Sequence, residues 1–324
     1  MSALLRVEGV VRSYRLPRTR LFGPAPVLRA VDGVSFTVAA GETLAVVGES
    51  GCGKSTLARL VMALDRPDQG RVLLEGTDLA QLSERALRPL RRRFQIVFQD
   101  PMGSLNPRLP VHRIVGETLA TLAKPPGRVE RRARIASALE SVGLAASDAA
   151  RYPHEFSGGQ RQRIAIARAL VTEPELIVAD EPVSALDLSV QAQVLNLLVE
   201  LQQRRGLAYL FISHNLAVVR HLARRTAVMY AGRFVETGPT AALFREPLHP
   251  YTRTLLAAVP RLDGVRHRLP VVEPLAPRAS GGCAFVDRCP LRQPHCAVVE
   301  PTLTAVAEDR AVACHLVQPP PTPL

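Results

Sequence analysis

The chain has 324 residues, the size of one large domain or two ordinary ones. Apolar residues make up 47% of it, so a sizeable core is possible and wholesale disorder is excluded. Lysine and arginine outnumber aspartate and glutamate by 41 to 29, which gives a formal net charge of +12. No apolar run approaches the roughly 18 residues of a membrane span, and the N-terminal segment lacks a signal-peptide layout. We therefore expect a cytosolic chain that does not itself cross a membrane.

Short β-rich runs alternate with helical patterns over residues 1–259, which predicts an α/β fold with a mainly parallel sheet covered by helices. Two of the runs are continuously apolar, as strands buried on both faces should be. The predicted strands after a β-rich N-terminal segment are residues 30–38, 42–47, 71–74, 94–98, 176–179, 208–212, 227–230 and 233–236. The predicted helices are residues 54–64, 111–122, 130–142, 159–171 and 190–203. Residues 101–156 show helices without intervening strands, so we expect a helical subdomain there.

The sequence changes character after residue 259. Residues 260–282 are rich in proline, glycine and arginine, which is typical of a linker. Residues 283–316 hold four of the five cysteines and predict a compact C-terminal module, followed by a flexible tail over 317–324.

A glycine-rich segment follows the apolar run 44–47 and has the pattern G-x-x-x-x-G-K-[ST]. Its glycines let consecutive backbone N–H groups converge on phosphate oxygens, and the helix that follows adds a favourable dipole. Lys54 and Lys124 are the only lysines, and all other Lys or Arg residues are arginines. A lysine in this loop therefore indicates a site that needs a compact ammonium, which can reach phosphates, rather than a planar guanidinium. The Ser55 hydroxyl would ligate Mg²⁺. An ordinary glycine-rich turn is the weaker alternative. The predicted phosphate-binding residues are Gly48, Glu49, Ser50, Gly51, Cys52, Gly53, Lys54, Ser55 and Thr56.

Two carboxylates, Asp180 and Glu181, follow the apolar run 176–179 and precede Pro182. Ligands bind at the carboxyl ends of buried parallel strands, which is where these side chains would lie. Asp180 would hold Mg²⁺, directly or through water, and Glu181 would polarise an attacking water. A solvated turn is the alternative, and the phosphate loop argues against it.

A second pair of glycines opens the predicted helix that begins near residue 159, behind a serine that can cap it. Taken alone, this is a capped helix with an anion-binding N-terminus. Combined with the phosphate loop and the two carboxylates, it closely resembles the signature motif of the ABC ATPases. The resemblance covers residues 1–259 in the expected order. The signature residues are Ser157, Gly158, Gly159 and Gln160, and the residues resembling the D-loop are Ser184, Ala185, Leu186 and Asp187.

The resemblance assigns further roles. Gln99 is similar to the Q-loop glutamine that also contacts Mg²⁺, and His214 to the switch histidine that contacts the γ-phosphate. Tyr14 falls where the family places an aromatic that stacks on adenine. The implied catalytic set is therefore Lys54, Gln99, Glu181 and His214, with ATP and Mg²⁺ as cofactors. Two such subunits, identical or not, would bind two ATP molecules head to tail, each between one phosphate loop and the other subunit's signature.

The last part of the chain resembles the oligopeptide and dipeptide permease ATPases, in Leu248-His-Pro-Tyr and the four cysteines that follow. This implies two transmembrane permease subunits, an extracytoplasmic solute-binding protein and a peripheral position on the cytoplasmic face of the inner membrane. A soluble ABC ATPase that acts on a macromolecule is one alternative. An importer of nickel, glutathione or another small solute is a second, and an iron- or redox-sensing role for the cysteines is a third.

The cysteine spacing is C-x5-C-x6-C-x17-C, formed by Cys283, Cys289, Cys296 and Cys314. Such a set could ligate a [4Fe–4S] cluster, as in some members of the subfamily, or tetrahedral Zn²⁺, with His295 or His315 replacing a thiol. Buried free thiols are the third possibility. Nothing in the motif places the module near ATP, so we expect a structural or docking role for it.

Residues 84–134 contain 12 basic and four acidic residues. This stretch is either a solvated face or a surface close to anionic headgroups and a membrane partner. Nucleic acid is the least supported partner, because there is no basic strand interleaved with aromatic residues, and we expect none.

Overall fold

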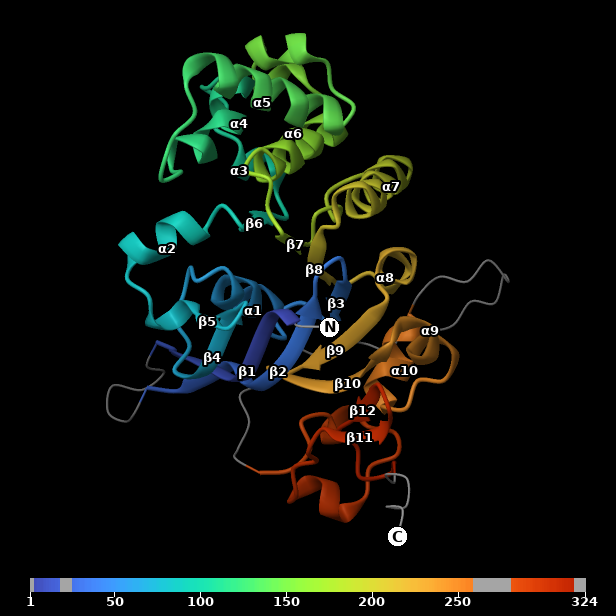
Figure 1. Ribbon diagram of the computed structural model, residues 1–324. Coiled ribbons are helices and arrows are strands. Elements are labelled where there is room, and N and C mark those ends of the chain that lie inside the picture. The colour runs from blue at the N-terminus through green and yellow to red at the C-terminus, as the bar shows by residue number, and fades with distance from the viewer. Residues whose placement is uncertain (1–2, 18–24, 259–280, 318–324) are drawn as a thin grey trace.

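A computed structural model describes residues 3–17, 25–258 and 281–317, and Figure 1 shows their arrangement. Nearly all of the predicted linker (260–282) and tail (317–324) lies outside the described residues. The chain forms a β-rich body, a helical lobe at the top of the view and a C-terminal module at the bottom. None of the described helices is long and apolar enough to cross a membrane.

The centre of the body is an eight-stranded sheet with the order β11-β12-β10-β9-β3-β8-β7-β6. Its five strands from β9 to β6 are mutually parallel, as predicted from the apolar runs. They are β3 (Thr43–Val47), β6 (Phe94–Val97), β7 (Leu176–Asp180), β8 (Ala208–Ser213) and β9 (Arg225–Tyr230). All residues of β3 and β8 are buried, because helices or a second sheet cover both faces.

A four-stranded antiparallel sheet covers one face of the core, in the order β2-β1-β4-β5. Its strands are β1 (Ala3–Arg15), β2 (Val27–Ala39), β4 (Gln69–Leu74) and β5 (Thr77–Asp78). Helices α1 (Lys54–Val61) and α2 (Glu84–Leu90) belong to this side of the molecule (Figure 1). Successive side chains of the core strands point to opposite faces of the sheet. Val46 packs toward the antiparallel sheet, whereas Val47 packs into a second hydrophobic core on the other face.

The helical lobe comprises α3 (Pro101–Ser104), α4 (Val111–Ala120), α5 (Arg128–Ser141), 3-10 turns over Ala146–Ala150 and Pro153–Glu155, and α6 (Gly158–Leu170). Residues 101–156 are all described and contain no strand, as expected of a helical subdomain, and the lobe continues through α6. Its core includes Ile114, Leu119, Leu139 and Ile166, all buried. Three arginines of the basic stretch 84–134 form ion pairs: Arg91 with Glu84, Arg93 with Glu75 and Glu175, and Arg134 with Glu130.

The remaining helices are α7 (Leu188–Arg205), α8 (Leu216–Leu222), α9 (Thr240–Arg245) and α10 (Pro250–Ala257). The sequence predicted α7 but not the short helices α2, α3, α8, α9 and α10. These have eight residues or fewer, too short for a helical period to stand out.

The C-terminal module continues the core sheet. Strand β12 (Arg310–Val312) pairs with β10 (Arg233–Pro239), and β11 (Thr304–Ala307) pairs with β12. The buried Glu236 carboxylate of β10 fixes this junction, since it accepts hydrogen bonds from the Arg310 guanidinium at 3.0 Å and from the N–H groups of Leu248 and His249. The module therefore docks on the body through backbone pairing and a buried ion pair, which the linker composition did not reveal.

Candidate functional site

The glycine-rich loop connects β3 to α1, the predicted strand–loop–helix context. Gly48 and Gly53 are required there for space: a Cβ on Gly48 would collide with the carbonyl of Met229, and one on Gly53 with the carbonyl of Ala30. Gly53 also has φ 109°, which side chains rarely tolerate. The loop is thus enclosed by strands β2 and β9, a rigid setting for a backbone phosphate cradle.

Lys54, the first residue of α1, is buried with 4% of its surface exposed. Its Nζ donates to the carbonyl oxygens of Gly48 and Glu49, both at 2.8 Å. The same Nζ lies 4.0 Å from Oε1 of Glu181. The ammonium is therefore held over the loop, where it can reach phosphate oxygens.

Glu181 is the point where the predicted catalytic residues meet. Its Oε2 accepts a hydrogen bond from Nε2 of Gln99 at 3.2 Å and lies 3.0 Å from Nδ1 of His214. With Lys54 on its other oxygen, three strand ends and the phosphate loop converge on one carboxylate. Glu181 has φ 47°, and its backbone carbonyl accepts from the Ser184 hydroxyl at 3.0 Å. The turn holds the side chain toward the loop, as a base for a water molecule requires.

Asp180 lies beside the first hydroxyl of α1. The Ser55 hydroxyl donates to Oδ1 of Asp180 at 3.4 Å, so the two predicted Mg²⁺ ligands are adjacent. Burial is the main cause that raises the pKa of Asp180, with the Glu181 charge adding to it, while Ser55 and Lys54 oppose the rise. A hydroxyl and a carboxylate side by side are the oxygen donors that Mg²⁺ prefers, so these residues fit the ion.

The signature residues form the start of α6, where a capping box fixes the helix. Ser157 accepts from the N–H of Gln160 at 3.3 Å, and the Gln160 side chain accepts from the N–H of Ser157 at 3.0 Å. Gly159 must be glycine because a Cβ would collide with Val190 on α7. The predicted D-loop, 184–187, leads into α7 on the same side.

Figure 1 shows α6 in the helical lobe, well separated from α1 in the body. One chain therefore does not bring its own signature to its own phosphate loop. The arrangement agrees with a signature that completes the site of a second subunit.

Tyr14 is half-buried on β1, and the structure gives its ring another neighbour. Its hydroxyl donates to Oδ2 of Asp65 at 2.8 Å, and the Arg12 guanidinium lies 5.0 Å from the ring centre. Stacking of adenine on Tyr14 stays a prediction.

The four C-terminal cysteines line one small cavity of about 20 Å³, together with His249 and His315. None of the five cysteines, all of them in described segments, forms a disulfide. Burial, with the neighbouring thiols of Cys289 and Cys296, raises the pKa of Cys314. Across the described ranges, no group of three or more His, Cys, Asp or Glu side chains is placed to hold a metal ion. The thiols are thus gathered, but the cavity is about the size of one water molecule and would have to widen for a [4Fe–4S] cluster.

Two residues that the motifs did not reveal touch the phosphate loop. The Tyr251 hydroxyl accepts from the N–H of Glu49 at 2.9 Å, and Arg288 of the C-terminal module pairs with the Glu49 carboxylate. The module therefore lies beside the phosphate loop, a position that the cysteine motif did not predict. No local spacing signals these contacts, because they join residues more than 200 positions apart.

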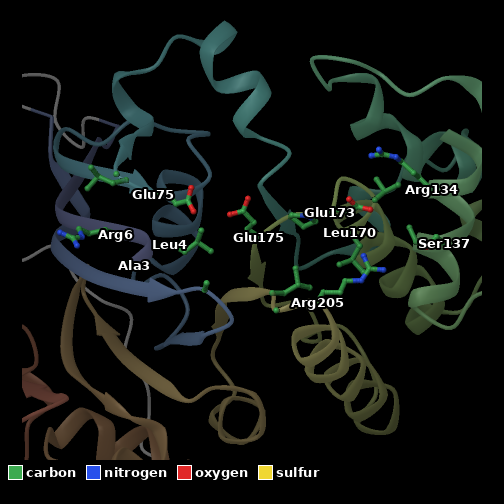
Figure 2. A pocket seen from close by; sticks show the side chains of 18 of the residues that line it. Ala3, Leu4, Arg6, Glu75, Arg134, Ser137, Leu170, Glu173, Glu175 and Arg205 are labelled. Carbon is green, nitrogen blue, oxygen red and sulfur yellow. The ribbon is translucent and has the colours of Figure 1, made fainter. Parts of the chain in front are cut away.

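A larger cavity of about 1230 Å³ lies elsewhere, between the edge of β1 and β4, helix α5 and the end of α7. Figure 2 shows charged side chains around it, among them Glu75, Glu175, Arg134 and Arg205. Among the described residues that line it there is none of the predicted ATP site. It is therefore separate from the chemistry at Glu181.

A strand, a glycine loop and a helix, with paired carboxylates ending a neighbouring parallel strand, define a P-loop nucleotide hydrolase. Residues 31–184 match the family model described as ABC transporter, and residues 235–296 match the model described as oligopeptide/dipeptide transporter, C-terminal region. A probable peptide ABC transporter ATP-binding protein of Sinorhizobium fredii is 53% identical over 98% of this chain and 91% of that protein. The dipeptide transport ATP-binding protein of Escherichia coli is 48% identical over 92% of this chain and 90% of its own.

Solved structures agree. The ATP-binding cassette MJ0796, a dimer in a post-hydrolysis state with ADP and phosphate, matches with a TM-score of 0.64 at 28% identity. That match covers 73% of this chain and 98% of the cassette. CbiO1 of Clostridium perfringens matches with a TM-score of 0.65 at 29% identity, over 76% of this chain and 92% of its own. The chain belongs to the ABC transporter family of ATP-binding proteins, which confirms the predicted fold and ATPase class.

Proposed function

We propose that this protein is the ATP-hydrolysing subunit of an ABC importer for dipeptides or oligopeptides. The observation that carries the ATPase part is the convergence of Lys54, Gln99 and His214 on the Glu181 carboxylate. The peptide part rests on the C-terminal match and on relatives named for peptide and dipeptide transport. A soluble ATPase acting on a macromolecule lacks this C-terminal support.

The residues divide the work by position. The loop N–H groups and Lys54 bind and orient the phosphates, while Glu181 accepts a hydrogen bond from the attacking water and takes its proton. Gln99 and His214 hold the Glu181 carboxylate, and His214 contacts the γ-phosphate. Mg²⁺, held by Ser55, Asp180 and Gln99, would neutralise charge on the phosphate oxygens when bound.

The separation of α6 from α1 supports a head-to-tail pair of ATPase subunits, identical or not. The signature residues of one subunit would cap the nucleotide on the other through the α6 N-terminus. The pair would lie beneath two permease subunits on the cytoplasmic face of the inner membrane and receive solute from an extracytoplasmic binding protein.

The four gathered cysteines support a metal centre, with a [4Fe–4S] cluster first and Zn²⁺ second. When bound, such a centre would tie together the module's loops and add to its folding free energy. Anaerobic purification followed by iron, sulfide and zinc analysis tests this. Brown protein with iron and sulfide supports the cluster, colourless protein with zinc the alternative, and metal-free protein refutes both.

The transport proposal is tested with the chain reconstituted in vesicles beside its permease pair and binding protein. We expect Mg²⁺-dependent ATPase activity that rises when the binding protein carries a dipeptide or oligopeptide. If the binding protein stimulates ATP hydrolysis only when it carries nickel or glutathione, that solute would replace peptides in the proposal. ATPase activity that ignores every loaded binding protein, with no co-purifying permease, would favour the soluble alternative.

A further inference from the structure

The phosphate loop contains an acidic residue, Glu49, between Gly48 and Ser50. A carboxylate there is unfavourable for a loop that binds a polyanion, because like charges repel. The Arg288 guanidinium forms a bidentate pair with this carboxylate: Nη1 donates to Oε2 and Nη2 donates to Oε1, each at 2.8 Å. The two side chains are 19% and 15% exposed, so solvent screens the pair only partly.

The position of Arg288 is fixed by an aromatic cluster. Its guanidinium carbon lies 5.6 Å from the ring centre of Phe285 and 5.9 Å from that of Tyr230. These rings pack on each other at 5.3 Å, and both pack on Tyr251. Because Tyr251 in turn accepts the N–H of Glu49, the C-terminal residues hold both the backbone and the side chain of this loop residue.

The same arginine belongs to the cysteine module. It ends the 3-10 turn Val286–Arg288 and directly precedes Cys289. The turn is held by backbone hydrogen bonds from Val286 to Cys283 and from Cys289 to Val286, and Cys283 donates to the carbonyl of Cys296 at 2.7 Å. The fold of the module thus sets where Arg288 stands.

We propose that Arg288 is a positioning residue for ATP binding, which neutralises and orients Glu49 so that the phosphate loop accepts the triphosphate. The inference rests on the proposed ATPase function. Without Arg288, a partly buried carboxylate would be left unpaired within the loop and would repel the nucleotide. Removing the Glu49 charge as well should remove that repulsion.

The test compares four forms of the full chain: wild type, R288Q, E49Q and the double variant E49Q/R288Q. Their Kd for ATP with Mg²⁺ is measured by titration calorimetry, and KM and kcat by ATPase assay. R288Q should weaken ATP binding about tenfold, the scale for losing hydrogen bonds to a charged group. Its KM should rise while kcat at saturating ATP stays within about twofold, since the loss concerns binding. The double variant should regain most of the affinity.

Two further variants separate charge from folding. R292Q removes an exposed arginine of the same module and should bind ATP like wild type. R288K keeps the positive charge but has a single nitrogen in place of the forked guanidinium, so its ATP affinity should lie between those of wild type and R288Q.

Wild-type affinity in R288Q would overturn the inference. So would a double variant as weak as R288Q, because that pattern belongs to a module that has merely lost its packing. Failure of the wild-type chain itself to bind ATP would refute the proposed function, and is distinguishable from both.

Discussion

Replacing Glu181 by glutamine tests the centre of the site. Glutamine has nearly the same shape, and its oxygen can still accept from Gln99 Nε2, which lies 3.2 Å from Glu181 Oε2. The substitution leaves Asp180 and Ser55 as they are. What is lost is the negative charge and the ability to take a proton from water. We therefore expect turnover to fall on the order of 10² or more, the usual scale for a positioned general base.

The same substitution should raise the affinity for ATP although it lowers turnover. Lys54 Nζ lies 4.0 Å from the Glu181 carboxylate, and the attraction of two unit charges at this distance is about 4 kcal/mol at an effective dielectric constant near 20. In the variant the Lys54 ammonium is no longer attracted to a carboxylate that competes with the phosphates. Screening and solvation offset most of the Coulomb energy, so we expect a net gain for phosphate binding of about 1 kcal/mol. That free energy corresponds to roughly fivefold tighter ATP binding.

The assay measures steady-state ATP hydrolysis and the ATP dissociation constant on the same preparations. Glu173→Gln is the matched control, because Glu173 also has a positive φ, 53°, and lies just before the opposite end of β7. It should leave both quantities unchanged. Near-normal turnover in E181Q would refute the assignment of Glu181 as base, and weaker ATP binding would refute the electrostatic argument.

Three other substitutions test separate features. K54R should abolish most ATP hydrolysis, because a planar guanidinium cannot make the two 2.8 Å hydrogen bonds of Lys54 to loop carbonyls; normal turnover would contradict this. G159A should lower the thermal unfolding midpoint, since the added methyl collides with Val190 and overpacking costs about 1 to 3 kcal/mol. Burial lowers the pKa of His249 to about 4 from 6.5, so below pH 6.5 the unfolded chain gains a proton that the folded chain does not. Urea unfolding should therefore show that the free energy of unfolding falls by about 3 kcal/mol between pH 6.5 and pH 4. This contribution should be absent in H249N, where the asparagine side chain can still accept a hydrogen bond from the N–H of Tyr251.

The sequence predicted most of the parallel sheet and the site, for a physical reason. The glycine loop, the carboxylates after β7 and the capped α6 are local patterns, and each dictates its own backbone conformation. Their meeting place follows from one rule, that parallel strands end at the same edge. Asp180 at the end of β7, Glu181 directly after it and His214 after β8 thus had to lie near Lys54.

What the sequence could not predict depends on contacts between distant segments. The pairing of β12 with β10 joins Val312 to Glu236, and neither short strand has a distinctive alternation. A linker rich in proline and glycine suggested a separate module, whereas the buried Glu236 carboxylate binds it to the body. The pairing of Arg288 with Glu49 is equally invisible, because an arginine among many carries no signal of its partner.

Sheet order explains why the end of the chain reaches its first functional loop. Strand β9 runs parallel to β3, with Val228 opposite Val47, so Tyr230 and the turn after it lie beside the phosphate loop. The N–H of Gly232 in that turn donates to the carbonyl of Cys52 at 2.9 Å. Helix α10 then adds Tyr251, and the module adds Arg288. Three successive C-terminal elements contact this one loop. Substitutions that loosen the C-terminal region should therefore change ATP affinity, even though they lie far in sequence from every nucleotide motif.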